Sequence, residues 1–176
     1  MSQYPVIAAG ARITAGLLSS MLPNYVIKPS DTAATSDVTL DNDPDLVTDT
    51  LTAGGVYAVE FHLRISGLTT AGIKVTWLTP SGTTGNRDCT GPGSANAVES
   101  NANTTEMRWA VHGYGTSVVY TNPRNSTSLQ TWVWEKSLVT IGATAGPINL
   151  RWAQNASAAT STFVAAGSYV KWQQVA

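Results

Sequence analysis

The chain has 176 residues, a length that suits one domain with a substantial core, and only 12% of its residues are charged. Its formal net charge is −1 and its ten Lys and Arg residues are scattered singly, so we expect no nucleic-acid binding, which needs a basic stripe. Thr, Ser and Asn carry most of the polarity, and this composition favours strands and turns over helices.

The first predicted element is a helix over residues 9–22, within which the sequence reads ARITAGLLSSMLP. Its large apolar residues recur at steps of three and four, which places them on one side of a helix: Ile13, Leu17, Leu18, Met21 and Leu22. Pro23 would end this helix, because proline lacks the required backbone donor. The stretch has no basic start and no cleavage site, and no apolar run approaches the ~20 residues that span a bilayer. We therefore expect neither a signal peptide nor a membrane anchor.

A lone helix of this length is marginal in water, and Gly16 weakens it further. It needs a surface to pack on. We therefore interpret residues 1–30 as an N-terminal arm for attachment or oligomerisation, in which the helix acts together with the preceding Tyr4, Val6 and Ile7.

The next stretch is extended, with a strand predicted over residues 35–40 and turns at Lys28-Pro29 and Asp43-Pro44. Carboxylates at alternate positions could surround calcium, and here they are Asp41, Asp43, Asp45 and Asp49. The stretch lacks the glycine and the glutamate of a calcium-binding loop, because Leu46 and Thr52 stand in those places. We expect a solvated acidic turn.

Strand patterns dominate the rest of the chain. From residue 57 to 66, Tyr57, Val59, Phe61, Leu63 and Ile65 alternate with polar or small residues. Further strands are predicted over 72–79, 106–113, 116–121, 129–142, 148–154, 161–164 and 169–175. About nine strands separated by Gly, Pro, Asn and Ser turns predict an all-β fold, a jelly-roll β-sandwich over residues 31–176.

Residues 80–105 interrupt this pattern. The stretch is too long for a hairpin loop and too poor in apolar residues for a core strand, so we predict a surface excursion. It contains the single cysteine, Cys89, which can form no intrachain disulfide. We interpret it as an incidental loop thiol rather than a nucleophile.

The sequence contains no catalytic or metal-ligating constellation. His62 and His112 are the only histidines, and they lack close ligand spacing. Glu60 and Glu135 could form a glycosidase pair, but their flanks are typical of outward-facing strand residues. We therefore expect no enzymatic activity and no cofactor.

Five of the six tryptophans divide into two groups. Trp77, Trp109 and Trp152 are in phase with aliphatic residues, which predicts positions in the core. Trp132 and Trp134 flank Val133 in a strand that is apolar on both faces, so they are candidates for a ligand surface or a subunit interface. Large residues on both faces suggest that a neighbouring copy covers part of a sheet, and we predict a homotrimer.

Four stretches bear on the kind of protein: YPVIAAGARITAGLLSSMLPNYVIKPSDT, DPDLV, GGVYAVEFHLRISG and the ending INLRWAQNASAATSTFVAAGSYVKWQQVA. They resemble small virion proteins of tailed phages that infect actinobacteria, often labelled minor tail proteins. The C-terminal half also resembles the trimeric jelly rolls of the tumour-necrosis-factor and complement C1q type, in which AGSYV leads into the closing strand. The resemblance implies a non-enzymatic component outside a particle, with copies around a three-fold axis.

These observations lead to an expected function. The protein is expected on the exterior of a virion, as a capsid decoration protein, with itself and major capsid or tail proteins as partners. The alternative is a minor tail or tail-fibre component that binds a host receptor or carbohydrate through Trp132, Trp134 and residues 80–105. A polysaccharide depolymerase is the least supported reading.

Overall fold

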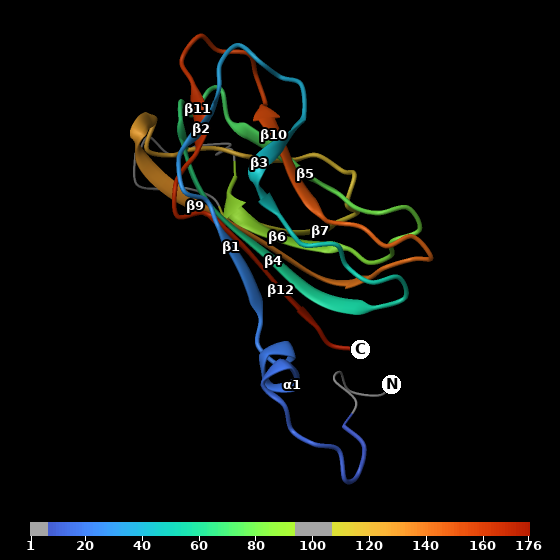
Figure 1. The fold of residues 1–176 in the computed structure, drawn as a ribbon. Coiled ribbons are helices and arrows are strands. Elements are labelled where there is room, and N and C mark those ends of the chain that lie inside the picture. Colours follow the sequence, from blue (N-terminus) through green and yellow to red (C-terminus); the bar gives the residue numbers. More distant parts are fainter. Residues whose placement is uncertain (1–6, 94–106) are drawn as a thin grey trace.

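The computed structural model describes residues 7–93 and 107–176, which form a β-sandwich with one short helix (Figure 1). The helix α1 spans Ala15–Ser20. The described strands are Asn24–Ile27 (β1), Thr32–Ala34 (β2), Asp41–Val47 (β3), Val56–Gly67 (β4), Ile73–Leu78 (β5), Arg87–Pro92 (β6), Met107–His112 (β7), Val118–Tyr120 (β8), Ser126–Thr140 (β9), Asn149–Gln154 (β10), Thr162–Val164 (β11) and Tyr169–Gln174 (β12).

The strand pairing identifies a jelly roll. The first strand pairs antiparallel with the last, the second with the one before it, and so on inward: β1 with β12, β2 with β11, β3 with β10, β4 with β9, β5 with β8 and β6 with β7. A long two-stranded ribbon that rolls up on itself has this order. It produces a large sheet, β1-β12-β4-β9-β6-β7, with β2 and β11 attached at one end, and a small sheet, β3-β10-β5-β8. The predicted all-β fold is confirmed.

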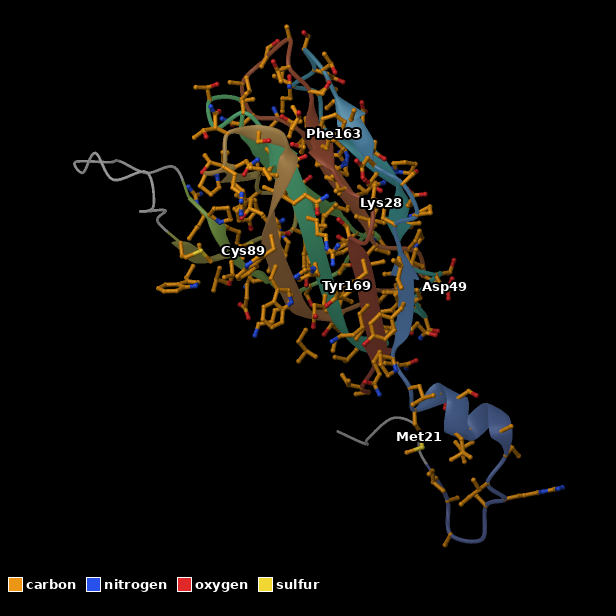
Figure 2. The ribbon with its side chains drawn as sticks, turned by 90° about the vertical axis from the view of Figure 1, so that its left-hand side faces the viewer. Met21, Lys28, Asp49, Cys89, Phe163 and Tyr169 are labelled. Atoms are coloured by element: carbon orange, nitrogen blue, oxygen red, sulfur yellow. The ribbon has the colours of Figure 1, made fainter. Side chains whose placement is uncertain are left out.

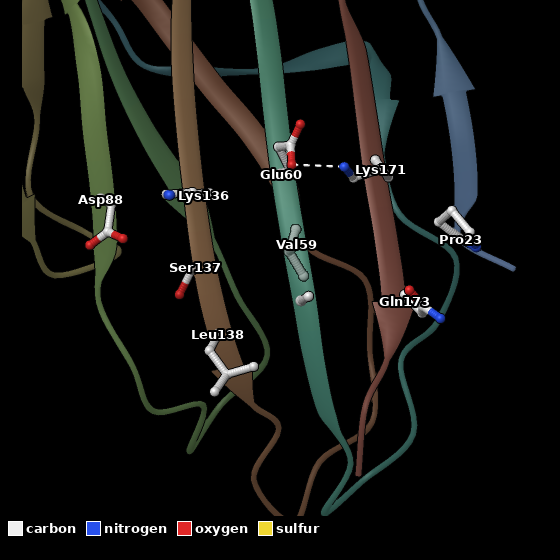
Figure 3. A pocket seen from close by; sticks show the side chains of 10 residues that line it. Pro23, Val59, Glu60, Asp88, Lys136, Ser137, Leu138, Lys171 and Gln173 are labelled. Carbon is white, nitrogen blue, oxygen red and sulfur yellow. Dashed lines mark ion pairs between the residues drawn. The ribbon is translucent and has the colours of Figure 1, made fainter. Parts of the chain in front are cut away.

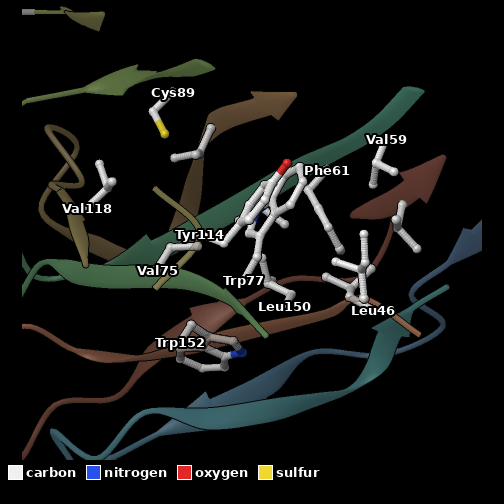
Figure 4. Close-up of a cluster of buried hydrophobic side chains, with 14 of the residues drawn as sticks. Leu46, Val59, Phe61, Val75, Trp77, Cys89, Tyr114, Val118, Leu150 and Trp152 are labelled. Carbon is white, nitrogen blue, oxygen red and sulfur yellow. The ribbon is translucent and has the colours of Figure 1, made fainter. Parts of the chain in front are cut away.

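The hydrophobic core lies between the two sheets (Figure 4). The alternating residues predicted from the sequence of β4 all point into it, and Phe61 meets Trp77 of the small sheet edge to face at 4.8 Å between ring centroids. Trp77 and Trp152 are buried, as predicted. The two-residue period of β4 therefore determines which of its residues reach the core.

A polar cluster also lies in this core, centred on Glu135 of β9. Its carboxylate accepts hydrogen bonds from Trp77 Nε1 (2.6 Å), Arg87 Nη1 (2.8 Å) and the Tyr120 hydroxyl (2.8 Å). Arg87 Nη2 donates in addition to the carbonyls of Gly113 and Thr116. The prediction that Glu135 faces outward is wrong, because the register of β9 turns it inward, where these donors replace water.

The predicted solvated acidic turn is also wrong. Asp43 is buried, and Lys28 Nζ lies 2.9 Å from its Oδ1 and 2.7 Å from Asp45 Oδ2. Trp152 Nε1 donates to the other oxygen of Asp43 at 2.9 Å. The ammonium of Lys28 thus lies between the two carboxylates, in the place where a calcium ion would bind. Pro44 lies in edge strand β3, where the pairing of β3 with β10 is irregular.

One predicted strand and one predicted loop are wrong. Residues 35–40 form no strand, because Ser36 adopts a left-handed conformation (φ 53°) and the Asp37 side chain accepts a hydrogen bond from the Thr39 backbone amide. Conversely, the predicted excursion over 80–105 contains strand β6, and Cys89 is a buried core residue in it. A strand needs only its inward side chains to be compatible with the core, so the polar Asp88 and Thr90 can face outward. Residues 94–105 lie outside the described part.

The N-terminal arm is only partly separate from the sandwich. Helix α1 is shorter than the predicted 9–22 and begins after Thr14, whose hydroxyl caps it by accepting from the Leu17 amide. It projects beyond the end of the sandwich and buries none of its residues (Figures 1 and 2). Residues 24–27, assigned to the arm from the sequence, are strand β1 of the large sheet. In the described chain, no helix reaches the length and apolarity needed to cross a bilayer.

Candidate functional site

The most unusual surface is the outer face of the large sheet, the face turned away from the small sheet. On β9, Val133, Glu135, Ser137 and Val139 point inward, so the tryptophans between them point outward. Trp132 and Trp134 are 44% and 38% exposed, and Leu138 further along is 62% exposed. The prediction that β9 carries large residues on both faces is confirmed, and the outward ones lack a covering layer within the described chain.

Strand register arranges this face in two rows that run across the sheet. One row is mainly apolar and aromatic: Ile27, Tyr169, His62, Trp134, Thr90 and Trp109. The neighbouring row alternates in charge between two apolar ends: Tyr25, Lys171, Glu60, Lys136, Asp88 and Val111. Side chains opposite each other on neighbouring strands lie about 4.5–5.5 Å apart at Cβ, so each row forms a continuous strip.

The middle of the aromatic row forms a hollow of about 330 Å³, here called the aromatic cradle. Its lining residues come from β4, β9 and β12, and they are Glu60, His62, Trp132, Trp134 and Tyr169. The His62 ring is parallel to that of Tyr169, with 14° between planes and 5.1 Å between centroids. It is also parallel to Trp132, at 10° and 6.4 Å. The three rings are therefore nearly parallel to one another, and they line the hollow on the outer face of the sheet.

The surroundings of His62 favour the neutral form of its imidazole. Burial lowers the pKa of His62 below its ordinary value, and the positive charge of Arg64 lowers it further, while Glu60 opposes the shift. Its Nδ1 atom is shielded and has no hydrogen-bond partner in the described chain. A neutral imidazole is the form that tolerates such a position, because a shielded cation without a partner is unfavourable.

Beside the cradle lies a groove with charged walls, here called the charged groove (Figure 3). Its volume is about 430 Å³, and its side chains come from β6, β9, β4 and β12, with Pro23 at one end. Lys171 Nζ and Glu60 Oε2 form an ion pair at 2.9 Å. The Lys136 ammonium lies 5.4 Å from the centroid of the Trp134 ring, so one charge of this groove also contacts the cradle.

Apolar residues mark both edges of the large sheet. At the β1 edge, Tyr25 and Ile27 are exposed, and at the β7 edge the exposed residues are Met107, Trp109 and Val111. The prediction that Trp109 lies in the core is wrong. Pairing with β6 places Ala110 beside buried Cys89 and turns Trp109 outward beside Thr90, to 77% exposure. Alternation shows which residues share a face, but register decides which face is buried.

The arm residues predicted to make interfaces are at the surface. Ile7, Ile13, Leu18, Met21 and Leu22 are exposed and Leu17 is half-buried. Tyr4 and Val6 lie outside the described residues. The arm touches the sandwich through Gln173, whose side-chain amide donates to the Met21 carbonyl at 2.8 Å.

The residues considered for catalysis do not converge. Glu60 lies on the outer face and Glu135 on the inner face of the same sheet, so they cannot act together as a glycosidase pair. His62 and His112 also point to opposite faces. Among residues 7–93 and 107–176, no three His, Cys, Asp or Glu side chains form a metal-binding group.

Two cradle residues were found from the sequence, and three were not. Trp132 and Trp134 stood out because they flank Val133. The contribution of His62, Glu60 and Tyr169 depends on the β4–β9 and β4–β12 registers, which bring together positions about 70 and 107 residues apart in the chain. The polar side of the β4 alternation was the only available signal for His62 and Glu60.

Comparisons with other proteins do not identify the chain. No model of a known protein family matches it, and no curated protein sequence matches it. Among solved structures, the infectious bursal disease virus Gt strain matches with 10% identity and a TM-score of 0.22, covering 88% of this chain and 42% of that one. The Gx strain matches with 11% identity and a TM-score of 0.19, covering 89% and 41%. The chain thus spans about two fifths of these structures, and overlaps of this quality add nothing to the fold described above.

Proposed function

We propose that this protein is a non-enzymatic structural component of a tailed-phage virion, a jelly-roll homotrimer on the outside of the particle. The observation that carries the proposal is the amount of apolar surface left uncovered at the arm and at both edges of the large sheet. Monomeric proteins rarely expose such surface over contiguous patches, which instead mark sites of protein contact. The resemblance of the two chain ends to small phage virion proteins supports the proposed location in a virion.

A ring of copies would use the two edges of the large sheet. The β1 edge presents Tyr25 and Ile27, and the β7 edge presents Met107, Trp109 and Val111. A contact between two different patches is head-to-tail, and it closes into a ring when the rotation between copies allows it. We propose three copies in this arrangement, with the β1 edge of each against the β7 edge of the next.

The arm would attach the protein to its particle or complete the contacts between copies. Its exposed apolar residues lie on a segment that projects beyond the sandwich, where another protein can reach them (Figure 2). Capsid decoration fits a compact domain with a short arm better than a tail fibre does, because a fibre needs a long shaft. A minor tail component remains the alternative position.

Deletion of residues 1–23 tests the proposal. We expect the truncated protein to keep a β-rich circular dichroism spectrum and to be missing from purified particles. In the full chain, Leu18→Asp and Leu22→Asp should each reduce incorporation, whereas Ser19→Asp should not, since Ser19 is exposed next to Leu18 on helix α1 but is not apolar. Normal incorporation of the truncated protein would contradict the proposal.

A further inference from the structure

The aromatic cradle lies outside the hydrophobic core. Its tryptophans point away from the core that β9 lines with Val133 and Val139. The backbone hydrogen bonds of the β4–β9 and β4–β12 ladders do not require aromatic side chains at these outward positions. Instead, four rings are gathered on the adjacent strands β12, β4 and β9. An arrangement of this kind is expected where rings contact a ligand.

The cradle offers flat apolar surface together with polar groups at one side. The rings of Tyr169, His62 and Trp132 are nearly parallel and form an apolar surface across strands β12, β4 and β9. Glu60 borders the hollow, and the partner of its carboxylate, Lys171 Nζ, lies 2.9 Å away. A volume of about 330 Å³ is at the lower end of the range typical of small-ligand sites, and it would hold only part of a longer molecule.

The surrounding charges indicate what kind of ligand fits. The charged row alternates in sign, from Lys171 to Glu60 to Lys136 to Asp88, so no net field favours a strongly charged ligand. The Glu60 carboxylate, which would attract an organic cation, is already paired with Lys171 at 2.9 Å, and Lys136 and Arg64 add further positive charge nearby. A single-stranded nucleic acid would need a basic groove along its backbone. A neutral ring with several hydroxyl groups meets neither obstacle.

We propose that the aromatic cradle binds a neutral pyranose unit of a saccharide. The C–H face of the sugar would stack on the indole rings of Trp132 and Trp134, and its hydroxyls would donate to the Glu60 carboxylate and accept from Lys171. Such mixed recognition, with an apolar face and a few placed polar groups, is general for small-ligand sites. The inference goes beyond the structural role proposed above and does not depend on a virion setting.

Titration calorimetry of the full-length protein tests this inference. The probes are cellotetraose and triacetylchitotriose as neutral saccharides, tetragalacturonate as an anionic one, and an oligothymidylate as a nucleic acid. We expect saturable binding of at least one neutral saccharide with a millimolar or tighter Kd, accompanied by a change in tryptophan fluorescence. Absence of neutral saccharide binding up to 10 mM, or binding of only tetragalacturonate or the oligothymidylate, would overturn the proposal.

Matched tryptophan variants locate the site. Trp132→Ala and Trp134→Ala should each weaken binding by about tenfold, because each removes a stacking ring. Leu138→Ala is the control, since Leu138 is more exposed than either tryptophan on the same strand but lies outside the cradle and outside the proposed contacts between copies. Equal weakening by all three variants would contradict the assignment. Circular dichroism of each variant separates lost binding from lost folding, and a failure here would leave the incorporation test above unaffected.

Discussion

The two faces of strand β9 reverse the usual distribution of side chains. Its inner face carries a glutamate and a serine into the core, while its outer face carries two tryptophans and Leu138 to the surface. Inside, the glutamate receives three side-chain donors, from Trp77, Arg87 and Tyr120. Outside, the large apolar side chains have no such complement in the described chain. The buried polar residues of β9 thus belong to the fold, and its outward-facing tryptophans and Leu138 are available for function.

Removing the inner glutamate should have the largest effect. We expect Glu135→Ala to lower the free energy of unfolding by about 3–5 kcal/mol, because Arg87 would be left as a buried charge without its partner. Urea denaturation measures this loss. The double variant Glu135→Leu with Arg87→Met should recover most of it, since apolar replacement of a whole buried pair is often neutral. A loss below about 1 kcal/mol would mean that the inner cluster is not structural.

The same cluster should suppress the chemistry of Cys89. Burial and the nearby Glu135 carboxylate raise the pKa of Cys89 from 9.0 to about 12. At pH 8 the reactive thiolate should therefore be about a thousandfold scarcer than for a free thiol. We expect no reaction with a disulfide reagent in the native protein and full reaction after denaturation in urea. Rapid reaction of the native protein would place Cys89 at the surface.

A buried and a partly exposed ion pair should differ in their contribution to stability. Lys28→Met removes the partner of buried Asp43, and we expect a loss of about 2 kcal/mol, moderated because three other groups still donate to that carboxylate. The matched control is Lys171→Met, which breaks the partly exposed pair with Glu60 and should cost about 1 kcal/mol or less. Denaturation curves that rank the two variants the other way would contradict this reading.

His62 should give the outer face a small pH dependence. Its pKa is lower in the folded protein than the ordinary value of 6.5, so the unfolded chain takes up a proton first as the pH falls. The contribution of His62 to stability is therefore complete above pH 6.5 and is lost as the pH falls toward the lowered folded-state pKa. We expect His62→Gln to reduce the pH dependence of the thermal unfolding midpoint below pH 6.5. Identical pH profiles of the variant and the wild type would contradict the shift.

The sequence predicts pattern better than register. The alternation from Tyr57 to Ile65 is enough to place β4 and its inward residues, because each of those residues is apolar. On β7 the same reasoning puts Trp109 inside, whereas its pairing with β6 puts it outside. The buried Asp43 and Glu135 were missed for a related reason. Most hydrogen-bond donors to these two carboxylates come from strands distant in sequence, so no local sequence pattern predicts that the carboxylates are buried.

The candidate site shows the same division. Trp132 and Trp134 were visible as apolar residues on the wrong face of a strand, but the cradle as a whole needs three strands in register. The short helix also depended on tertiary context, since only residues 15–20 keep helical geometry where the arm has nothing to pack on. Local signals therefore find the strands, and long-range pairing builds the site.

The most direct test of the central claim, that the uncovered apolar edges are contacts between copies, is the mass of the protein in solution. Light scattering at micromolar concentration should give three times the single-chain mass of 18.5 kDa. The variants Ile27→Asp and Trp109→Asp, one on each edge, should each lower the mass to that of one chain without loss of β structure, because a head-to-tail ring needs both edges. A mass of 18.5 kDa for the unaltered protein would contradict the account.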